Sequence, residues 1–573
     1  MKKMVKTLIF SLFCLSLILA GCTNSKGNGD QAGSPNASNG GNAGNAGENA
    51  VSEPGSYPIV KDKITLRVMA AQIPQVIDFN TNEFTKWYEE RTNIHVEWEI
   101  VPPGNVKEKL NLVLASGDYP DIFLGLGVDD VIEAQYGVGQ QVFRPLDDLI
   151  EQNMAAFKEV LQKHPAVKGR ITATDGNIYS LPTWNDCFHC GFAQKMWINQ
   201  EWLDNLGLQM PTTTDEFYQV LKAFKEKDPN GNGKADEIPL AGATDGWYTT
   251  IEGFLMSSFI LHPGMYNPLK MIVQDGKVMS IVNTPEYKEG LAYLNKLYAE
   301  GLIYQPSFTQ KIDQLKSIAA NEDSVILGAF PTGASVGVID SATNQERYKQ
   351  YVTVPPLKGP DGTRQAAFFQ FDAAQGGDLL ISSSSKYPEA AIRWADGLYE
   401  FETQYRMISG PKDIGWTTPD PGAVGLNGKP ALLKRLKPYT NEPQNDGWMH
   451  AGVEYAPAEW RLGEQIEPNA DLFSPEGLER LLYEETAKNY QPYAPENTTV
   501  MPPVKLLAEE NDELQTIRIE LENYINESSV RFITGDLKPE ADWDSYVQSL
   551  DNIGLKRFVE INQKAYDRQY AGN

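Results

Sequence analysis

Short apolar segments alternate with amphipathic helical segments from Lys63 onward, and this alternation limits the possible folds more than any other feature. Predicted strands cover 64–69, 95–100 and 121–124, and predicted helices cover 83–92 and 106–115. A strand–helix–strand order favours parallel pairing, because the helix returns the chain to the starting edge of the sheet. The sequence therefore predicts an α/β fold.

The chain is also too long for a single hydrophobic core, since it has 573 residues. Further helices have clear start signals. Thr213 and Glu216 have the spacing of a capping box before a helix over 217–227, and Thr284-Pro285 begins a helix that ends at Gly301. More than one α/β domain is expected.

The first residues have the pattern of an export signal. Lys2, Lys3 and Lys6 precede the apolar run 8–20, which is shorter than the ~20 residues that a membrane-spanning helix needs. The sequence Leu-Ala-Gly-Cys at 19–22 resembles the bacterial lipobox. This resemblance implies that residues 1–21 are a removed signal peptide and that Cys22 carries the lipid anchor.

Residues 22–59 are rich in Gly, Asn and Ser and contain few large apolar side chains. Such a segment buries too little surface to offset the entropy lost on ordering. We expect it to be a disordered tether between the lipid anchor and the folded part.

Charge and cysteine content exclude several classes of protein. The net charge of −26 at pH 7 argues against binding to nucleic acid. Four cysteines are too few for a disulfide scaffold in a chain of this length. Cys187 and Cys190, in Cys-Phe-His-Cys, leave open a metal site, a local disulfide or two ordinary thiols. A metal site is disfavoured because a fourth ligand is not evident, and two ordinary thiols are favoured.

Five groups of residues resemble, in the same order along the chain, the sequence motifs of one protein family. The last group resembles the C-terminal signature of the Gram-positive lipoprotein branch of that family. The matching segments are 117–123 (GDYPDIF), 175–182 (DGNIYSLP), 196–203 with 211–217, 376–382 with 385–392, and 542–547 through 563–568. The chain thus resembles the extracellular solute-binding proteins of family 1, the maltose-binding-protein class.

This resemblance implies a two-lobed periplasmic-binding-protein-like fold of type II, with a mostly parallel sheet flanked by helices in each lobe and a ligand cleft at the hinge. Lobe 1 would hold 60–184 and 365–500, including an inserted subdomain over about 400–500. Lobe 2 would hold 185–360 and 505–573. The protein would be a monomer on the extracytoplasmic face of the membrane of a Gram-positive bacterium.

The segment 228–237, DPNGNGKADE, has the donor spacing of a calcium loop. Oxygen-bearing side chains stand at its positions 1, 3, 5 and 9, with a glycine at position 6, although Pro239 occupies the position of the usual final Glu. The segment resembles the calcium loop of alginate-type oligosaccharide-binding proteins, which implies structural Ca²⁺ and these ligands: Asp228, Asn230, Asn232, Lys234 through its carbonyl, Asp236 and Glu237. A polar turn without metal is the alternative.

Aromatic residues beside polar ones are the candidates for solute binding. A sugar ring offers an apolar face to aromatic side chains and hydroxyl groups to polar ones. The candidate ligand-binding residues are Trp184, Asn185, Asp186, Trp247, Tyr248, Phe330, Phe371, Asp372, Trp416, Trp448, Trp460 and Arg461.

Binding without catalysis is the expected function. The segment 333–337 fits the G-x-S-x-G pattern of a hydrolase, but Pro331-Thr332 interrupts the strand-to-helix turn that such a site requires. We predict capture of an oligosaccharide for an ABC importer, with its membrane permease as partner. The alternatives are a binding protein for a peptide or sensory ligand, and an anchored polysaccharide hydrolase.

Overall fold

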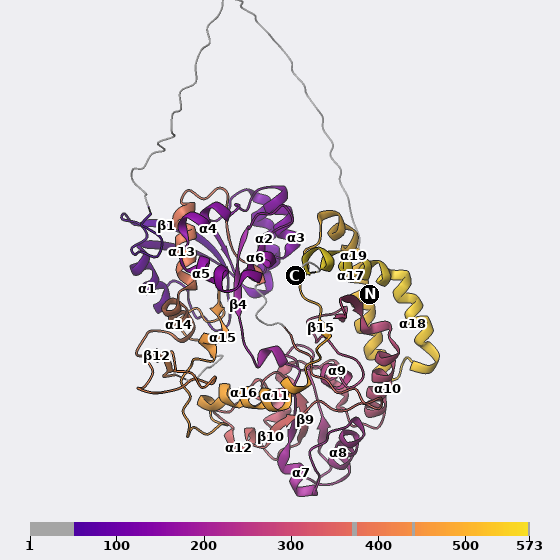
Figure 1. Ribbon diagram of the computed structural model, residues 1–573. Coiled ribbons are helices and arrows are strands. Elements are labelled where there is room, and N and C mark those ends of the chain that lie inside the picture. Colours follow the sequence, from indigo (N-terminus) through magenta and orange to yellow (C-terminus); the bar gives the residue numbers. More distant parts are fainter. Residues whose placement is uncertain (1–50, 370–374, 438–441, 571–573) are drawn as a thin grey trace, which may run out of the picture. The chain divides into compact units, whose positions relative to one another are not determined.

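The structure, a computed structural model, describes residues 51–369, 375–437 and 442–570 (Figure 1). The predicted signal peptide, Cys22, Phe371 and Asp372 lie outside these residues. Within them, no helix combines the length and the apolar character needed to cross a membrane.

Lobe 1 is built on a six-stranded sheet in the order β14-β4-β11-β3-β1-β2. β1 pairs in parallel with both β2 and β3, whereas β11 is antiparallel to both of its neighbours. The strands are β1 (Ile64–Ala71), β2 (Ile94–Val101), β3 (Ile122–Leu124), β4 (Ser180–Asn185), β11 (Gln375–Ile381) and β14 (Tyr455–Ala456). The alternation of predicted strands and helices up to residue 124 is confirmed.

Helix α1 (Glu83–Thr92) shows why the first α/β unit forms where it does. The Asn82 side chain accepts a hydrogen bond from the Phe84 N–H, and Asn93 ends the helix in the left-handed region at φ 59°. Phe84 and Tyr88 are buried, and the Tyr88 hydroxyl donates to the carbonyl of Trp394 on α13 (Pro388–Asp396). The helix is therefore fixed at both ends and along its apolar face.

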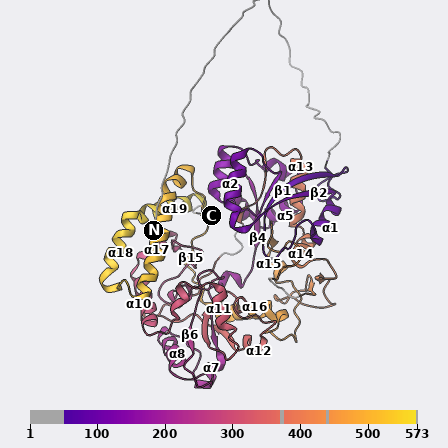
Figure 2. The same cartoon turned by 180° about the vertical axis from the view of Figure 1, so that it is seen from behind.

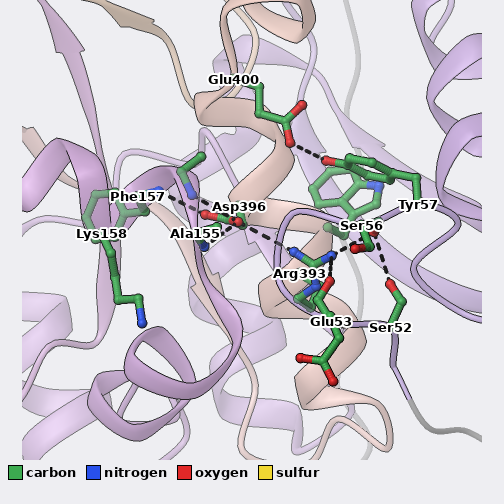
Figure 3. Close-up of polar contacts among 12 residues, drawn as sticks. Ser52, Glu53, Ser56, Tyr57, Ala155, Phe157, Lys158, Arg393, Asp396 and Glu400 are labelled. Atoms are coloured by element: carbon green, nitrogen blue, oxygen red, sulfur yellow. Dashed lines mark hydrogen bonds and ion pairs between the residues drawn. The ribbon is translucent and has the colours of Figure 1, made fainter.

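Residues 51–59, which the sequence analysis assigned to the tether, are packed on lobe 1. Arg393 on α13 is fully buried and donates to the carbonyls of Glu53 and Ser56, at 3.1 and 2.8 Å (Figure 3). Val51 forms a β-bridge with Val60, and Ile59 is fully buried. The tether prediction is therefore wrong for these residues, because both backbone carbonyls and the apolar side chains of Val51, Tyr57 and Ile59 attach the segment to the lobe 1 core.

The same buried arginine joins this segment to a second helix. Asp396 lies 3.6 Å from Arg393 and accepts hydrogen bonds from the backbone N–H groups of Ala155 and Phe157, at the start of α5 (Ala156–Lys163) (Figure 3). A carboxylate at a helix N-terminus is stabilised by the exposed N–H groups there. Three distant parts of the chain thus meet at one ion pair.

Lobe 2 is built on the four-stranded sheet β10-β5-β9-β6 and a second sheet, β15-β7-β8. In the first sheet only β6 and β9 pair in parallel, so this sheet is not mostly parallel as expected. In the lobe 1 sheet, three of the five strand pairings are parallel. The strands are β5 (Met196–Asn199), β6 (Ile238–Leu240), β7 (Met271–Gln274), β8 (Lys277–Ser280), β9 (Leu327–Pro331), β10 (Tyr351–Val354) and β15 (Thr498–Val500).

The helices of lobe 2 begin at the predicted caps. Thr213 accepts a hydrogen bond from the Glu216 N–H at α8 (Thr214–Glu226), and Thr284 does the same for Tyr287 at α10 (Pro285–Ala299). The three C-terminal helices pack against one another and cover the same core (Figures 1 and 2). They are α17 (Ala508–Thr534), α18 (Pro539–Ile553) and α19 (Leu555–Tyr570).

The boundary predicted for lobe 1 at residue 500 differs from the structure. Leu478, Leu481 and Leu482 on α16 (Leu478–Asn489) belong to the apolar cluster of Trp197 and Phe330, which is part of lobe 2. β15 also pairs with β7. The chain therefore leaves lobe 1 after about residue 467, because Glu464 and Gln465 still form β-bridges with the lobe 1 insertion, whereas the apolar face of α16 is buried against lobe 2.

The expected insertion corresponds to a small irregular region between α14 (Phe401–Ser409) and α15 (Ala458–Arg461). It contains the two-stranded sheet of β12 (Trp416–Thr417) and β13 (Lys434–Arg435). Trp416, Leu433 and Tyr405 form its own small apolar cluster. This region forms part of the wall described below.

Asp378 on β11 has an unusual protonation equilibrium. Its Oδ2 accepts a hydrogen bond from the Thr183 N–H at 2.9 Å. Burial raises the pKa of Asp378 to about 7, and Glu454 adds to this effect, while the Thr183 bond opposes it. Between about pH 4 and pH 7 the Asp378 carboxyl is therefore mostly protonated in the folded protein. In the unfolded chain, where an aspartate has a pKa of about 4, it is mostly ionised over the same pH range.

We predict that Asp378→Asn reduces the loss of stability between about pH 4 and pH 7. The wild type loses stability as pH rises through this window, by at most on the order of 4 kcal/mol from Asp378. Urea unfolding at several pH values measures the difference, with Asp313→Asn, at an exposed position on α11 (Ile312–Ala319), as control. Equal pH dependence in wild type and Asp378→Asn would contradict the assignment.

Candidate functional site

A cavity of about 500 Å³ lies between the two lobes. We call it the interlobe cavity. Lobe 1 contributes residues from β13, α14, β14 and α15, and lobe 2 contributes residues from α16 and from the loops at 247–249 and 332–337. A volume in this range is typical of sites for small molecules.

The lobe 1 wall combines aromatic rings with charged groups. Trp460 lies with its ring centroid 5.0 Å from those of Tyr455 and Phe401. Tyr405 donates from its hydroxyl to the carbonyl of Trp460 at 3.2 Å. This packing leaves the Trp460 side chain partly exposed in the cavity wall.

Trp247 provides the aromatic surface of the lobe 2 wall. Its carbonyl accepts hydrogen bonds from the Gly333 N–H and the Thr332 hydroxyl, both at 3.1 Å. A Cβ at position 333 would lie 2.4 Å from the indole ring, so glycine is required for this approach. The Trp247 ring is therefore held in a fixed position at the cavity.

Ion pairs connect the two walls. Arg461 of lobe 1 contacts Glu479 of lobe 2 at 3.2 Å and donates to the Asn185 side chain at 3.1 Å. Burial acts to raise the pKa of Glu479, but Arg461 and His189 outweigh it and hold this pKa well below its usual range. Glu479 is therefore a charged group at the point where the lobes meet.

A second arginine in the wall has a carboxylate partner of its own. Arg435 donates from Nε and Nη2 to the two carboxylate oxygens of Glu464, at 2.8 and 2.9 Å. This bidentate geometry fixes both side chains. Glu454 lies nearby, where its Oε1 accepts from Asn185 at 3.1 Å and its Oε2 is 3.6 Å from His450.

The chain crosses between the lobes at a turn closed by a disulfide between Cys187 and Cys190. The expectation of two ordinary thiols is therefore wrong. Lys195, fully buried, donates to the carbonyls of His189 and Phe192 and holds the same turn. Burial lowers the pKa of Lys195 to about 7, although Glu485 opposes the shift. The His189 ring shares a small cluster with both sulfurs, which the disulfide removes from the set of metal ligands.

Comparison with known proteins agrees with this architecture. The family model of the bacterial extracellular solute-binding protein matches residues 74–404. The chain belongs to this family of solute-binding proteins. The two-lobed α/β fold expected from the sequence is confirmed by its structural relatives.

One curated relative spans nearly the whole chain. It is the fructooligosaccharide ABC transporter substrate-binding protein FusA of Streptococcus pneumoniae serotype 4, 29% identical over 90% of this chain and 92% of its own. The solved structure of FusA in complex with kestose is similar at a TM-score of 0.73, with 26% identity over 89% of this chain and 100% of that one. A structure of a FusA EF-hand mutant with fructo-nystose gives a TM-score of 0.72 at 26% identity, over 89% of this chain and 100% of that one.

Four of the predicted ligand-binding residues line the cavity of this solute-binding protein: Asn185, Trp247, Trp460 and Arg461. They come from both lobes, as a site at the hinge requires. Their role in binding stays a prediction. Asp186 follows Asn185, and its N–H donates to the carbonyl of Ala456, but its side chain is not part of the wall.

Five other predicted residues are buried in cores instead, and their assignment to the wall is corrected. Trp184 lies in the lobe 1 core against His164, Trp448 stacks among the rings of Phe84 and Trp98, and Trp416 packs on Tyr405. In lobe 2, Phe330 packs on Tyr351 and Tyr248 on Phe369. The same physical reason applies to all five residues. A large ring loses more apolar surface to burial in a core than in a cavity wall, and this burial is favourable.

Sequence reasoning missed most of the charged wall. The residues concerned are His189, Gln404, Tyr405, Arg435, His450, Glu454, Glu464 and Glu479. The one signal available was the density of aromatic and charged residues over 454–464, EYAPAEWRLGE, which contains the predicted Trp460 and Arg461.

The predicted calcium loop follows α8 directly. Asp228 accepts hydrogen bonds from the backbone N–H groups of Asn232 and Gly233, at 3.0 and 2.8 Å. Gly231 and Gly233 have φ values of 69° and 73°, which allow the chain to turn sharply. Asn230 and Asn232 both direct side chains to Asp236, and a buried oxygen of Glu237 has no hydrogen-bond partner. The carboxylate and amide oxygens of this loop are the kind of ligand that a hard cation such as Ca²⁺ prefers.

Ser335, the centre of the G-x-S-x-G pattern, is fully buried on a 3-10 turn (Ser335–Gly337). Its side chain is not among those that line the cavity. The pattern therefore does not present this hydroxyl to the candidate site.

Proposed function

We propose that this solute-binding protein captures an oligosaccharide in the interlobe cavity and delivers it to the permease of an ABC importer. The observation that carries the proposal is the pairing of two aromatic platforms from opposite lobes, Trp247 and Trp460, with a ring of fixed polar groups. FusA, the similar protein described above, is a fructooligosaccharide-binding component of such a transporter.

The geometry suits a sugar for a physical reason. The apolar face of a pyranose or furanose ring packs on an indole, while its hydroxyls both donate and accept hydrogen bonds. The wall offers acceptors on Glu454 and Glu464 and donors on Arg435 and Arg461. A solute that touches both lobes binds best when they are closed, so it shifts the population toward the closed form.

The membrane context completes the proposal. A lipid on Cys22 would hold the protein at the extracytoplasmic face of the membrane, where a monomer meets the permease. Mass spectrometry of the protein purified from membranes tests the anchor, since a diacylated Cys22 would be the first residue of the mature chain.

We predict that Trp247→Ala weakens binding of a neutral trisaccharide such as kestose by about 1–3 kcal/mol, because the substitution removes one aromatic platform. Isothermal titration calorimetry measures the affinity. Trp87→Ala, a half-buried tryptophan on α1 outside the cavity wall, serves as the control and leaves the affinity unchanged. Equal affinities for wild type and Trp247→Ala would remove Trp247 from the site.

The same samples distinguish the alternative functions. New reducing ends after incubation with oligosaccharides would identify a hydrolase and overturn the proposal of binding alone. A rise in Tm with peptides but with none of the oligosaccharides would identify a peptide-binding protein.

We further propose that the loop 228–237 binds a structural Ca²⁺. Asp228, Asn230, Asn232, Asp236, Glu237 and the carbonyl of Lys234 would hold the ion, which would neutralise the cluster of carboxylates. The FusA EF-hand mutant supports this proposal, because it shows that a similar protein has a loop of this class.

We predict that EDTA lowers the Tm of the wild type and that Asp228→Ala removes this sensitivity, because Asp228 is the first ligand of the loop. Differential scanning calorimetry with added Ca²⁺ or EDTA measures both effects. Asp361→Ala removes an aspartate that caps a similar exposed turn at Thr363 and keeps full sensitivity to EDTA. A wild type indifferent to EDTA would contradict the site.

A further inference from the structure

The ion pairs in the wall of the interlobe cavity carry an inference about the charge of the solute, and it rests on the proposed oligosaccharide function. Oligosaccharides are either uncharged or, when built from uronic acids, carry a carboxylate on each unit. A site for the charged class needs cationic side chains whose hydrogen-bond donors are available to those carboxylates.

Both arginines of the wall already bind carboxylates of the protein. Arg435 uses Nε and Nη2 on Glu464, and its Nη1 donates to Ser409 at 3.1 Å. Arg461 uses Nη2 on Glu479 and Nη1 on Asn185. A solute carboxylate that used the remaining N–H groups of these arginines would lie close to the protein carboxylate that already neutralises each guanidinium, which is unfavourable.

The remaining charges of the wall are negative. Glu454 faces the cavity, and its Oε2 lies 3.6 Å from the His450 imidazole, which is charged only when protonated. In the described part of the chain, Glu454 has no ion pair with an arginine or a lysine. Burial lowers the pKa of His189, against the influence of Glu479, and so disfavours the charged form of this imidazole. Three glutamates therefore face two arginines in the wall.

The side cavity next to this wall repeats the pattern. It shares Arg435, Glu464 and Glu479 with the interlobe cavity. Its lysines are also paired, Lys434 with Asp420 at 2.7 Å and Lys437 with Asp446 at 2.7 Å. A longer chain that extended from one cavity into the other would thus meet no unpaired lysine among the described residues of the side cavity.

The field of the whole protein acts in the same direction. With a net charge of −26, the chain repels a polyanionic solute over distances up to the Debye length, which slows its association. Hydroxyl groups, in contrast, can donate to the glutamates and accept from the arginines without breaking any ion pair.

From these contacts we propose that the interlobe cavity selects uncharged oligosaccharides and rejects those that contain uronic acids. The paired arginines position neutral hydroxyls, and the excess of glutamates excludes carboxylates.

Binding of trisaccharides of equal length tests this selectivity in the full mature protein. Calorimetry compares a panel of neutral trisaccharides, including kestose and maltotriose, with trigalacturonate at low ionic strength. We expect at least one neutral trisaccharide to bind about tenfold or more tightly than trigalacturonate. Tighter binding of trigalacturonate would overturn the inference and leave the oligosaccharide function standing. Binding of none of these sugars would overturn both.

Two variants test the stated cause. Glu464→Gln frees the guanidinium of Arg435, and Glu454→Gln removes a carboxylate that no arginine or lysine of the described residues pairs. We expect each variant to raise the affinity for trigalacturonate by about tenfold and to reduce the discrimination against it. Tm measurements identify a variant that fails to fold, and the other variant then decides the outcome.

Glu513→Gln is the matched control, because it breaks a bidentate pair with Arg557 of the same kind on the surface of lobe 2. It leaves the affinities for neutral and acidic sugars unchanged. If folded Glu464→Gln and Glu454→Gln discriminate as strongly as the wild type, the wall carboxylates do not set the charge preference.

Discussion

The arrangement of the cavity depends on the contact between Arg461 and Glu479, which reaches from one lobe to the other. A carboxylate at a partly dehydrated surface is stable only when a cation or hydrogen-bond donors face it. Glu479 lies in the first turn of α16, which is fixed in lobe 2 by its leucines, whereas Arg461 ends α15 in lobe 1. The relative placement of two otherwise separate cores is thus coupled to this pair, together with the contact of Lys505 of lobe 2 with Glu133 of lobe 1 at 3.2 Å. Separating the lobes exposes both charges to water, which compensates for the lost contact and allows opening at moderate cost.

Much of lobe 1 could be predicted because its early elements are local in sequence. The alternation over 64–124 in lobe 1 and the caps at Thr213 and Thr284 in lobe 2 each involve residues a few positions apart. The side on which α16 packs could not be predicted, because the same apolar stripe could have covered either lobe. The attachment of residues 51–59 was missed for a related reason. It depends on Arg393, more than three hundred residues away, and on carbonyl groups that every residue has.

The candidate site was predictable only in part. Tryptophan next to polar residues located Trp247 and Trp460, but the same pattern occurs at Trp448, whose indole N–H donates to Thr85 inside the core. An indole N–H needs a polar partner both in a core and in a cavity wall. The local sequence therefore does not distinguish a buried tryptophan from one that lines the site. The pairs Arg435–Glu464 and Arg461–Glu479 join residues from different elements. Their geometry follows from tertiary packing and has no sequence signature.

The disulfide at the lobe crossing makes the rigidity of the interlobe cavity wall depend on the redox state of the cellular compartment. A bridge across such a short loop, between Cys187 and Cys190, restricts the unfolded chain weakly and contributes on the order of 2 kcal/mol. Its main effect is to fix the turn that presents His189 to Glu479. Newly made chains in a reducing cytosol would hold this turn through the hydrogen bonds of Lys195 and the backbone hydrogen bonds of the turn itself. The wall would therefore reach its final rigidity after export, in the compartment where the solute is found.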